Sequence, residues 1–141
     1  MNKTRNVTLA ALLGTGALLA AASAAAHHSA AMFDGTKLVV LKGTMLSFTN
    51  LNPHGWISVQ AKVDGKGKTE RWDIESTSPA QLAGMGLRAE TLKAGDKVTV
   101  AIRPLKDGRR GGAMVFIITP DGVAHGAKPS DLGLDVAILK P

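Results

Sequence analysis

The stretch 55-GWISVQAKVDGKGKTERWDIES-76 decides the fold of this chain. Gly55–Val63 alternates apolar and polar residues, which is the pattern of a β-strand with one buried face. Asp64–Gly67 is a glycine-bearing turn, and Thr69–Ser76 returns as a second strand. The sequence therefore predicts a β-hairpin. With Gly65-Lys66 as its two-residue loop, paired residues have numbers that sum to 131.

This register decides which side chains share a face. Ile57 lies opposite Ile74 and Val59 opposite Trp72, so one face is apolar and buried. The other face carries polar groups and a tryptophan: Trp56 opposite Glu75 and Ser58 opposite Asp73, with His54 at the edge. In OB-folds this outer face of strands two and three binds ligands, so we take it as a candidate ligand-binding face.

The rest of the chain adds three strands and a short helix. The strands are expected at Lys37–Phe48, Lys97–Arg103 and Gly112–Thr119. Ser78 and Pro79 start the helix as N-cap and first residue. The order β-β-β-α-β-β predicts an all-β domain with one short helix, a small five-stranded OB-like barrel. A two-sheet sandwich is the alternative.

The first 26 residues read as a secretory signal peptide. A short basic segment holds Lys3 and Arg5, an apolar run follows from Val7 to Ala22, and Ser23–Ala26 supplies small residues. We expect cleavage near Ala24 to Ala26, a periplasmic or secreted protein and no retained membrane span. A retained N-terminal anchor is the alternative.

The remaining chain is divided by composition. We expect an N-terminal arm at 27–36, the barrel at 37–125 and a loosely packed, glycine- and proline-bearing tail at 126–141. Cysteine is absent, which excludes disulfides and thiolate chemistry. The net charge of +6 becomes +4 without Lys3 and Arg5, too mild to indicate a nucleic-acid binder.

His27-His28 follows the predicted cleavage zone directly. Cleavage after Ala26 leaves His27 first, so that its α-amine and imidazole can chelate a metal, with His28 or His54 completing a three-nitrogen set. Cleavage after Ala25 or Ala24 leaves a histidine third, which forms a planar nitrogen site. Planar nitrogen sets favour Cu(II) or Ni(II), so we expect copper as the candidate cofactor. A solvated arm without a metal is the alternative.

Four ionisable groups of the barrel have simpler interpretations. His54 can hydrogen-bond a loop carbonyl and stack on Trp56 instead of binding a metal. Asp73 and Glu75 are expected to form ion pairs, with Arg71 and Arg103 as the obvious partners. His125 has no evident partner in the sequence.

The sequence carries no nucleophile elbow, zinc-protease helix motif, P-loop or dinucleotide fingerprint, so we do not expect an enzyme. Our first hypothesis is an exported copper-binding protein using His27, His28 and His54. The second is a non-catalytic module that binds a ligand or periplasmic protein partner around Trp56. Nucleic-acid binding comes last, because no basic stripe surrounds the tryptophans and export removes the partner.

The chain also resembles a family of small exported bacterial proteins of unknown function. The resemblance extends through the mature chain to about Gly122, and its most specific pieces are Asn52-Pro53-His54-x-Trp56 and Gly95-Asp96-x-Val98-x-Val100. Further matches are His27-His28-Ser29, Met32-Phe33-Asp34, Gly43-Thr44, Trp72-x-Ile74-Glu75, Pro104-Leu105-x-Asp107-Gly108 and Asp121-Gly122. The resemblance implies export and an OB-like barrel, and it implies no activity.

Overall fold

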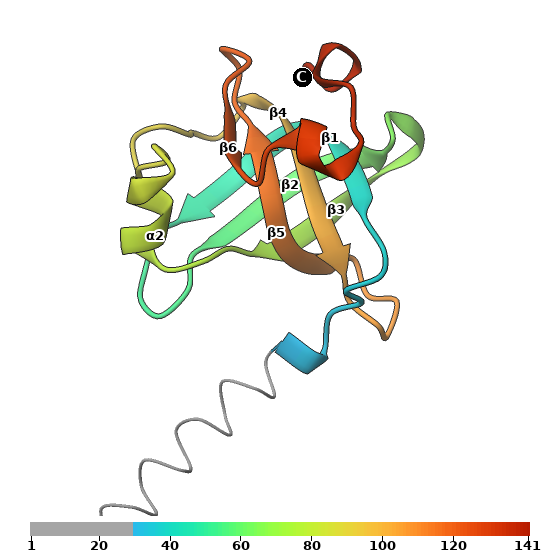
Figure 1. The fold of residues 1–141 in the computed structure, drawn as a ribbon, viewed down its shortest axis with the longest axis horizontal. Helices are drawn as coiled ribbons and strands as arrows, with labels where there is room; N and C mark the ends of the chain where they lie inside the picture. Colours follow the sequence, from blue (N-terminus) through green and yellow to red (C-terminus); the bar gives the residue numbers. More distant parts are fainter. Residues whose placement is uncertain (1–29) are drawn as a thin grey trace, which may run out of the picture. The chain divides into compact units, whose positions relative to one another are not determined.

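The computed structural model describes residues 30–141, and the elements named below belong to the unit Phe33–Pro141 (Figure 1). The helices and strands of this unit are β1 (Val39–Thr49), β2 (Trp56–Val63), β3 (Lys66–Glu75), α2 (Pro79–Gly84), β4 (Lys97–Pro104), β5 (Gly111–Ile118), β6 (Ala124–Gly126) and two 3-10 helices, Pro129–Leu132 and Val136–Ile138. Within residues 30–141, no helix combines the length and the apolar character that a membrane crossing needs.

Five of the strands close into a barrel. The sheet runs in the order β3-β2-β1-β4-β5-β6, with antiparallel neighbours. A parallel pairing of Asp73–Glu75 with Gly111–Ala113 then joins β3 to β5 and closes the ring. The predicted OB-like barrel with one short helix is confirmed, and the sandwich is wrong, because one continuous sheet curls to cover its own apolar face.

Closure brings neighbouring strands very close at two glycines. A Cβ on Gly43 of β1 would lie 2.1 Å from the carbonyl oxygen of Gln60. A Cβ on Gly112 of β5 would lie 2.4 Å from the carbonyl oxygen of Arg103. Glycine at these positions therefore allows the strong coiling that a five-stranded ring requires.

The β2–β3 hairpin has the predicted register but a different loop. Ile57 pairs with Ile74 and Val59 with Trp72, as expected. The two loop residues, however, are Asp64 and Gly65, whose φ angles of 48° and 70° fit a type I′ turn, and Val63 pairs with Lys66. A bulge between Ala61 and Val63 then restores the register. Each side chain keeps the face of the hairpin that was predicted for it, because this irregularity displaces the pairing by an even number of residues.

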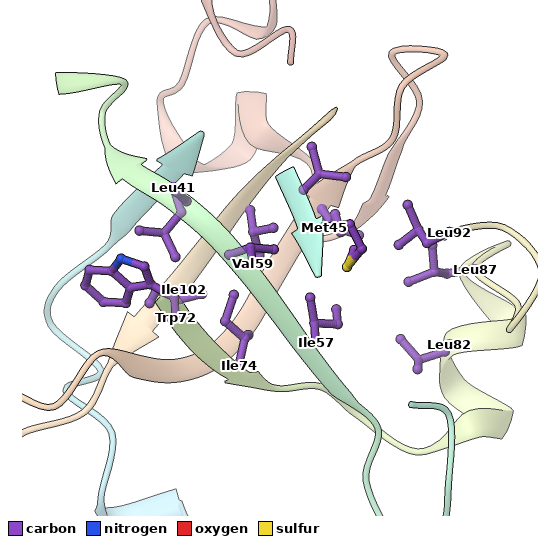
Figure 2. Packing of buried hydrophobic residues seen from close by; sticks show 14 residues of the cluster. Leu41, Met45, Ile57, Val59, Trp72, Ile74, Leu82, Leu87, Leu92 and Ile102 are labelled. Atoms are coloured by element: carbon purple, nitrogen blue, oxygen red, sulfur yellow. The ribbon is translucent and has the colours of Figure 1, made fainter. Parts of the chain in front are cut away.

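The barrel interior is filled by side chains from all five strands and capped by α2. Figure 2 shows Leu82, Leu87 and Leu92 gathered at the α2 end, with Trp72 at the opposite end of the core. Ser78 caps the helix as predicted, because its Oγ accepts a hydrogen bond from the Gln81 N–H at 3.4 Å. The short helix thus covers the end of the barrel next to the β1–β2 loop.

The C-terminal tail contributes leucines to a second apolar cluster. Val40, Ala101, Phe116 and Ile118 form a second apolar cluster with Leu139, against which Leu132 and Leu134 also pack. Leu139 is only 4% exposed. Only Pro129 and Leu139 of the tail are buried, and its widely spaced leucines cover a second hydrophobic face, away from the barrel core.

Candidate functional site

The candidate site lies on the outer face of β2 and β3. The pairs predicted from the sequence are observed there: Trp56 with Glu75, and Ser58 with Asp73. Trp56 is 50% exposed, whereas Trp72 on the other face of the hairpin is buried. The outer face therefore combines one accessible indole with hydroxyl and carboxylate groups.

Asp73 is the centre of a hydrogen-bonded network on this face. Arg71 donates to its carboxylate through Nε at 3.1 Å and Nη2 at 2.9 Å, and Ser58 donates through Oγ at 2.5 Å. The Arg71 guanidinium, with help from the Ser58 hydroxyl, holds the pKa of Asp73 below its usual value. The predicted ion pair with Arg71 is confirmed. The other candidate, Arg103, instead donates to the Lys37 carbonyl at 2.8 Å.

His54 is paired with the other predicted carboxylate. Its Nδ1 forms a short contact with Glu75 Oε1, so the expected hydrogen bond to a loop carbonyl is wrong. The backbone fixes this geometry, because the Gly55 N–H donates to the Thr77 carbonyl at 3.1 Å and the Ser76 N–H donates to the Gly55 carbonyl at 2.9 Å. The β1–β2 loop is thereby fastened to the end of β3, which carries Glu75.

This pairing leaves one imidazole nitrogen available. When Nδ1–H donates to a carboxylate, the neutral ring keeps its lone pair on Nε2. The His54 side chain is 42% exposed, and that of Glu75 is 15% exposed. A carboxylate that fixes the tautomer and orientation of a histidine is the usual outer partner of a metal-binding imidazole. His54 is therefore equipped to present one nitrogen ligand.

The described residues do not complete a metal site. Within residues 30–141, no three histidine, cysteine, aspartate or glutamate side chains gather closely enough to hold a metal ion. His27 and His28, the other predicted ligands, lie outside the described residues. His54 with Glu75 is thus at most one part of a site.

The contacts of two residues, His125 and Arg110, were not predicted from the sequence. His125 is only 8% exposed: its Nδ1–H donates to the Met85 carbonyl at 2.9 Å, and its Nε2 lies 3.3 Å from Thr119 Oγ1. Treating the Pro120-Asp121-Gly122 turn as a hairpin would have placed His125 in a strand, where it pairs with Ile117. Arg110 forms an ion pair with Glu70 at 2.7 Å, and its guanidinium carbon lies over Trp72, 5.6 Å from the ring centroid.

Two pockets lie away from this face. One, of about 290 Å³, is lined by residues that include Glu90, Asp96 and Asp121. The other, of about 430 Å³, lies between β1, the β2–β3 turn and the C-terminal tail. Neither of these two pockets is lined by Trp56, Ser58, Asp73 or Glu75.

The fold and this face define a small closed OB-like barrel with a polar, tryptophan-bearing outer surface. Residues 16–114 match the family described as "Family of unknown function (DUF6152)", and the chain belongs to that family. No curated protein and no solved structure matches the chain. The resemblance to a family of unknown function is confirmed, and membership brings no activity to this chain.

Proposed function

We propose that this protein is an exported binding protein that holds Cu(II) through its processed N-terminus, His27 or His28, and His54. The observation that carries the proposal is the pairing of His54 Nδ1 with Glu75, which leaves Nε2 free for a metal. The α-amine that cleavage near Ala24 to Ala26 would create, together with the imidazole of His27 or His28, supplies the remaining nitrogens. Planar nitrogen sets favour Cu(II) or Ni(II), and we take Cu(II) as the ion of this proposal.

The proposal is tested on protein secreted by the cell and purified without an N-terminal tag. Intact-mass spectrometry first identifies the starting residue. Cu(II) titration is then followed by electron paramagnetic resonance and by Trp56 fluorescence in a Trp72→Phe background. We expect nitrogen hyperfine structure, quenching of Trp56, and an affinity that falls about tenfold or more in His54→Ala and in Glu75→Gln.

Asp73→Asn is the matched control for Glu75→Gln. Both change a carboxylate of the same outer face to an amide, but Asp73 is engaged by Arg71 and Ser58, so its replacement should leave Cu(II) affinity unchanged. Replacement of His27 and His28 together by alanine should abolish tight binding. An uncut chain, or unchanged affinity in that double variant, would contradict the proposal.

A second candidate function is contact with a ligand or protein partner through Trp56. The half-exposed indole supports it, because a large aromatic residue outside the core is a frequent anchor of interfaces. Trp56→Ala should leave the free energy of unfolding within about 1 kcal/mol of the parent and lose the contact. Crosslinking in the periplasm with a photoreactive residue at position 56 tests it, and failure to trap any neighbour counts against it.

A further inference from the structure

The pocket of about 430 Å³ under the tail has an apolar wall and a single cationic side. Val40 and Leu139 form the buried part of the wall, and Leu134 extends it. Ile138 stands at the rim with 68% of its surface exposed. A large aliphatic side chain left this open beside a hollow is covered when an apolar ligand enters.

Lys42 provides the cationic side. Its Nζ donates to the carbonyl oxygens of Ile138 at 2.5 Å and of Lys140 at 3.1 Å. An ammonium group has three donors, so one remains for a ligand. Two carbonyls do not neutralise the charge, and in residues 30–141 no carboxylate forms an ion pair with Lys42.

The neighbouring strand increases the local positive charge. Lys62 of β2 pairs directly with Lys42 of β1, so two ammonium groups project from opposite positions on the same face. Like charges in this arrangement are unfavourable, and a bound anion relieves them. Asp64 lines the same pocket from the β2–β3 turn. It offsets part of the charge, and a net positive group of side chains remains.

We propose that this pocket binds a single-chain anionic amphiphile, with an alkyl chain along Val40, Leu139 and Ile138 and a carboxylate on Lys42. The alkyl chain of such a molecule would pack against the apolar wall of the pocket, and its carboxylate would accept a hydrogen bond from the remaining donor of the Lys42 ammonium. A short anion alone would leave the wall uncovered, and an uncharged hydrocarbon would leave Lys42 uncompensated. The inference is independent of copper binding.

The test is a titration of the purified protein with decanoate, followed by amide shifts in nuclear magnetic resonance spectra. Acetate supplies the headgroup alone, and decanol supplies the chain alone. We expect decanoate to shift the amides of Gly65 and Ile138, and acetate to leave them unmoved at the same concentration. Decanol should bind more weakly than decanoate.

The variants separate recognition of the charge from packing of the tail. Lys42→Met should weaken decanoate binding about tenfold and leave decanol binding as it was, and Lys42→Arg should restore most of the loss. Lys97→Met is the matched control, because Lys97 is another strand lysine whose Nζ donates to Thr44 Oγ1 at 2.8 Å. Equal decanoate affinity in Lys42→Met and the parent, an equal loss in Lys97→Met, or no shift at the pocket would overturn the proposal.

Discussion

The two histidines of the barrel, His54 and His125, have opposite surroundings. His54 lies in the β1–β2 loop with 42% of its side chain exposed and one nitrogen held by Glu75. His125 lies in β6, 8% exposed, with its nitrogens facing the Met85 carbonyl and Thr119 Oγ1. His54 is therefore a candidate ligand at the surface, whereas His125 is a buried link between elements.

The difference separates the histidine that is a candidate metal ligand from the one that is not. His125 connects β6 to the C-terminal end of α2 and to Thr119, so both of its nitrogens are used inside the protein. His54 uses only Nδ1, and that nitrogen faces a carboxylate. The number of nitrogens left free, more than burial alone, separates a candidate ligand from a structural residue.

The largest effect is expected from replacing each histidine by alanine. His125→Ala leaves the Met85 carbonyl without its donor and opens space in a buried site, so we expect a loss of about 3 kcal/mol in the free energy of unfolding. His54→Ala should cost under about 1 kcal/mol, because 42% of the side chain is exposed and its loss opens no buried cavity. Urea denaturation of both variants measures the comparison, and equal losses would contradict it.

A methyl group added at Gly55, in the loop that carries His54, should have the next largest effect on the free energy of unfolding. A Cβ on Gly55 would lie 2.6 Å from Ser76 Oγ and 3.1 Å from the Thr49 carbonyl oxygen. Gly55→Ala should therefore cost about 2 kcal/mol and move His54 away from Glu75. Thermal unfolding and the Cu(II) titration together check this. Parental stability in the variant would mean that the loop is not fastened as described.

Most of the fold was predictable, because alternation in strands directly reflects burial. The register of β2 and β3 followed from matching apolar residues across the turn, and it is observed at Ile57–Ile74 and Val59–Trp72. The loop was misplaced by one residue, because Asp64-Gly65 and Gly65-Lys66 are both acceptable hairpin loops. The bulge that reconciles the loop with the register lies opposite Gly67, whose φ is 74°, and a glycine inside a strand is a weak local sign of such an irregularity.

The site was less predictable, because polar partners depend on tertiary geometry. Sequence spacing placed Glu75 and Asp73 on one face correctly. It could not assign Asp73 to Arg71 alone, or Glu75 to His54, since these choices depend on side-chain directions and on the path of the β1–β2 loop. His125 was missed for the same reason: its partners, Met85 and Thr119, come from separate elements.

Gly84 and Gly86 provide a test of how constrained the backbone next to His125 is. Gly86 has a φ of 80°, and a Cβ there would lie 3.4 Å from His125 Nδ1, whereas Gly84 in α2 has open space around its Cβ position. Gly86→Ala should cost about 1 kcal/mol through backbone strain. Gly84→Ala should be neutral or stabilise the helix by up to about 1 kcal/mol. Chemical denaturation of the two variants side by side tests whether the backbone next to His125 is as constrained as the structure indicates.

The smallest effect concerns acid stability on the His54 side, where Asp73 is held by Arg71 and Ser58. These partners lower the pKa of Asp73 below its ordinary value of 3.8. A carboxylate with a lower pKa in the folded state contributes stability that is present above the pKa of the unfolded chain and is lost as the pH falls through the folded value. Because the side chain is half exposed, that contribution should be under about 1 kcal/mol.

Asp73→Asn should therefore be slightly less stable than the parent at pH 7. The difference in the free energy of unfolding should narrow below about pH 4, where the Asp73 carboxylate of the parent loses its charge. Denaturation at a series of pH values measures the gap, and a difference that stays constant down to pH 2 would show that the ion pair adds nothing to the stability of the face that carries His54.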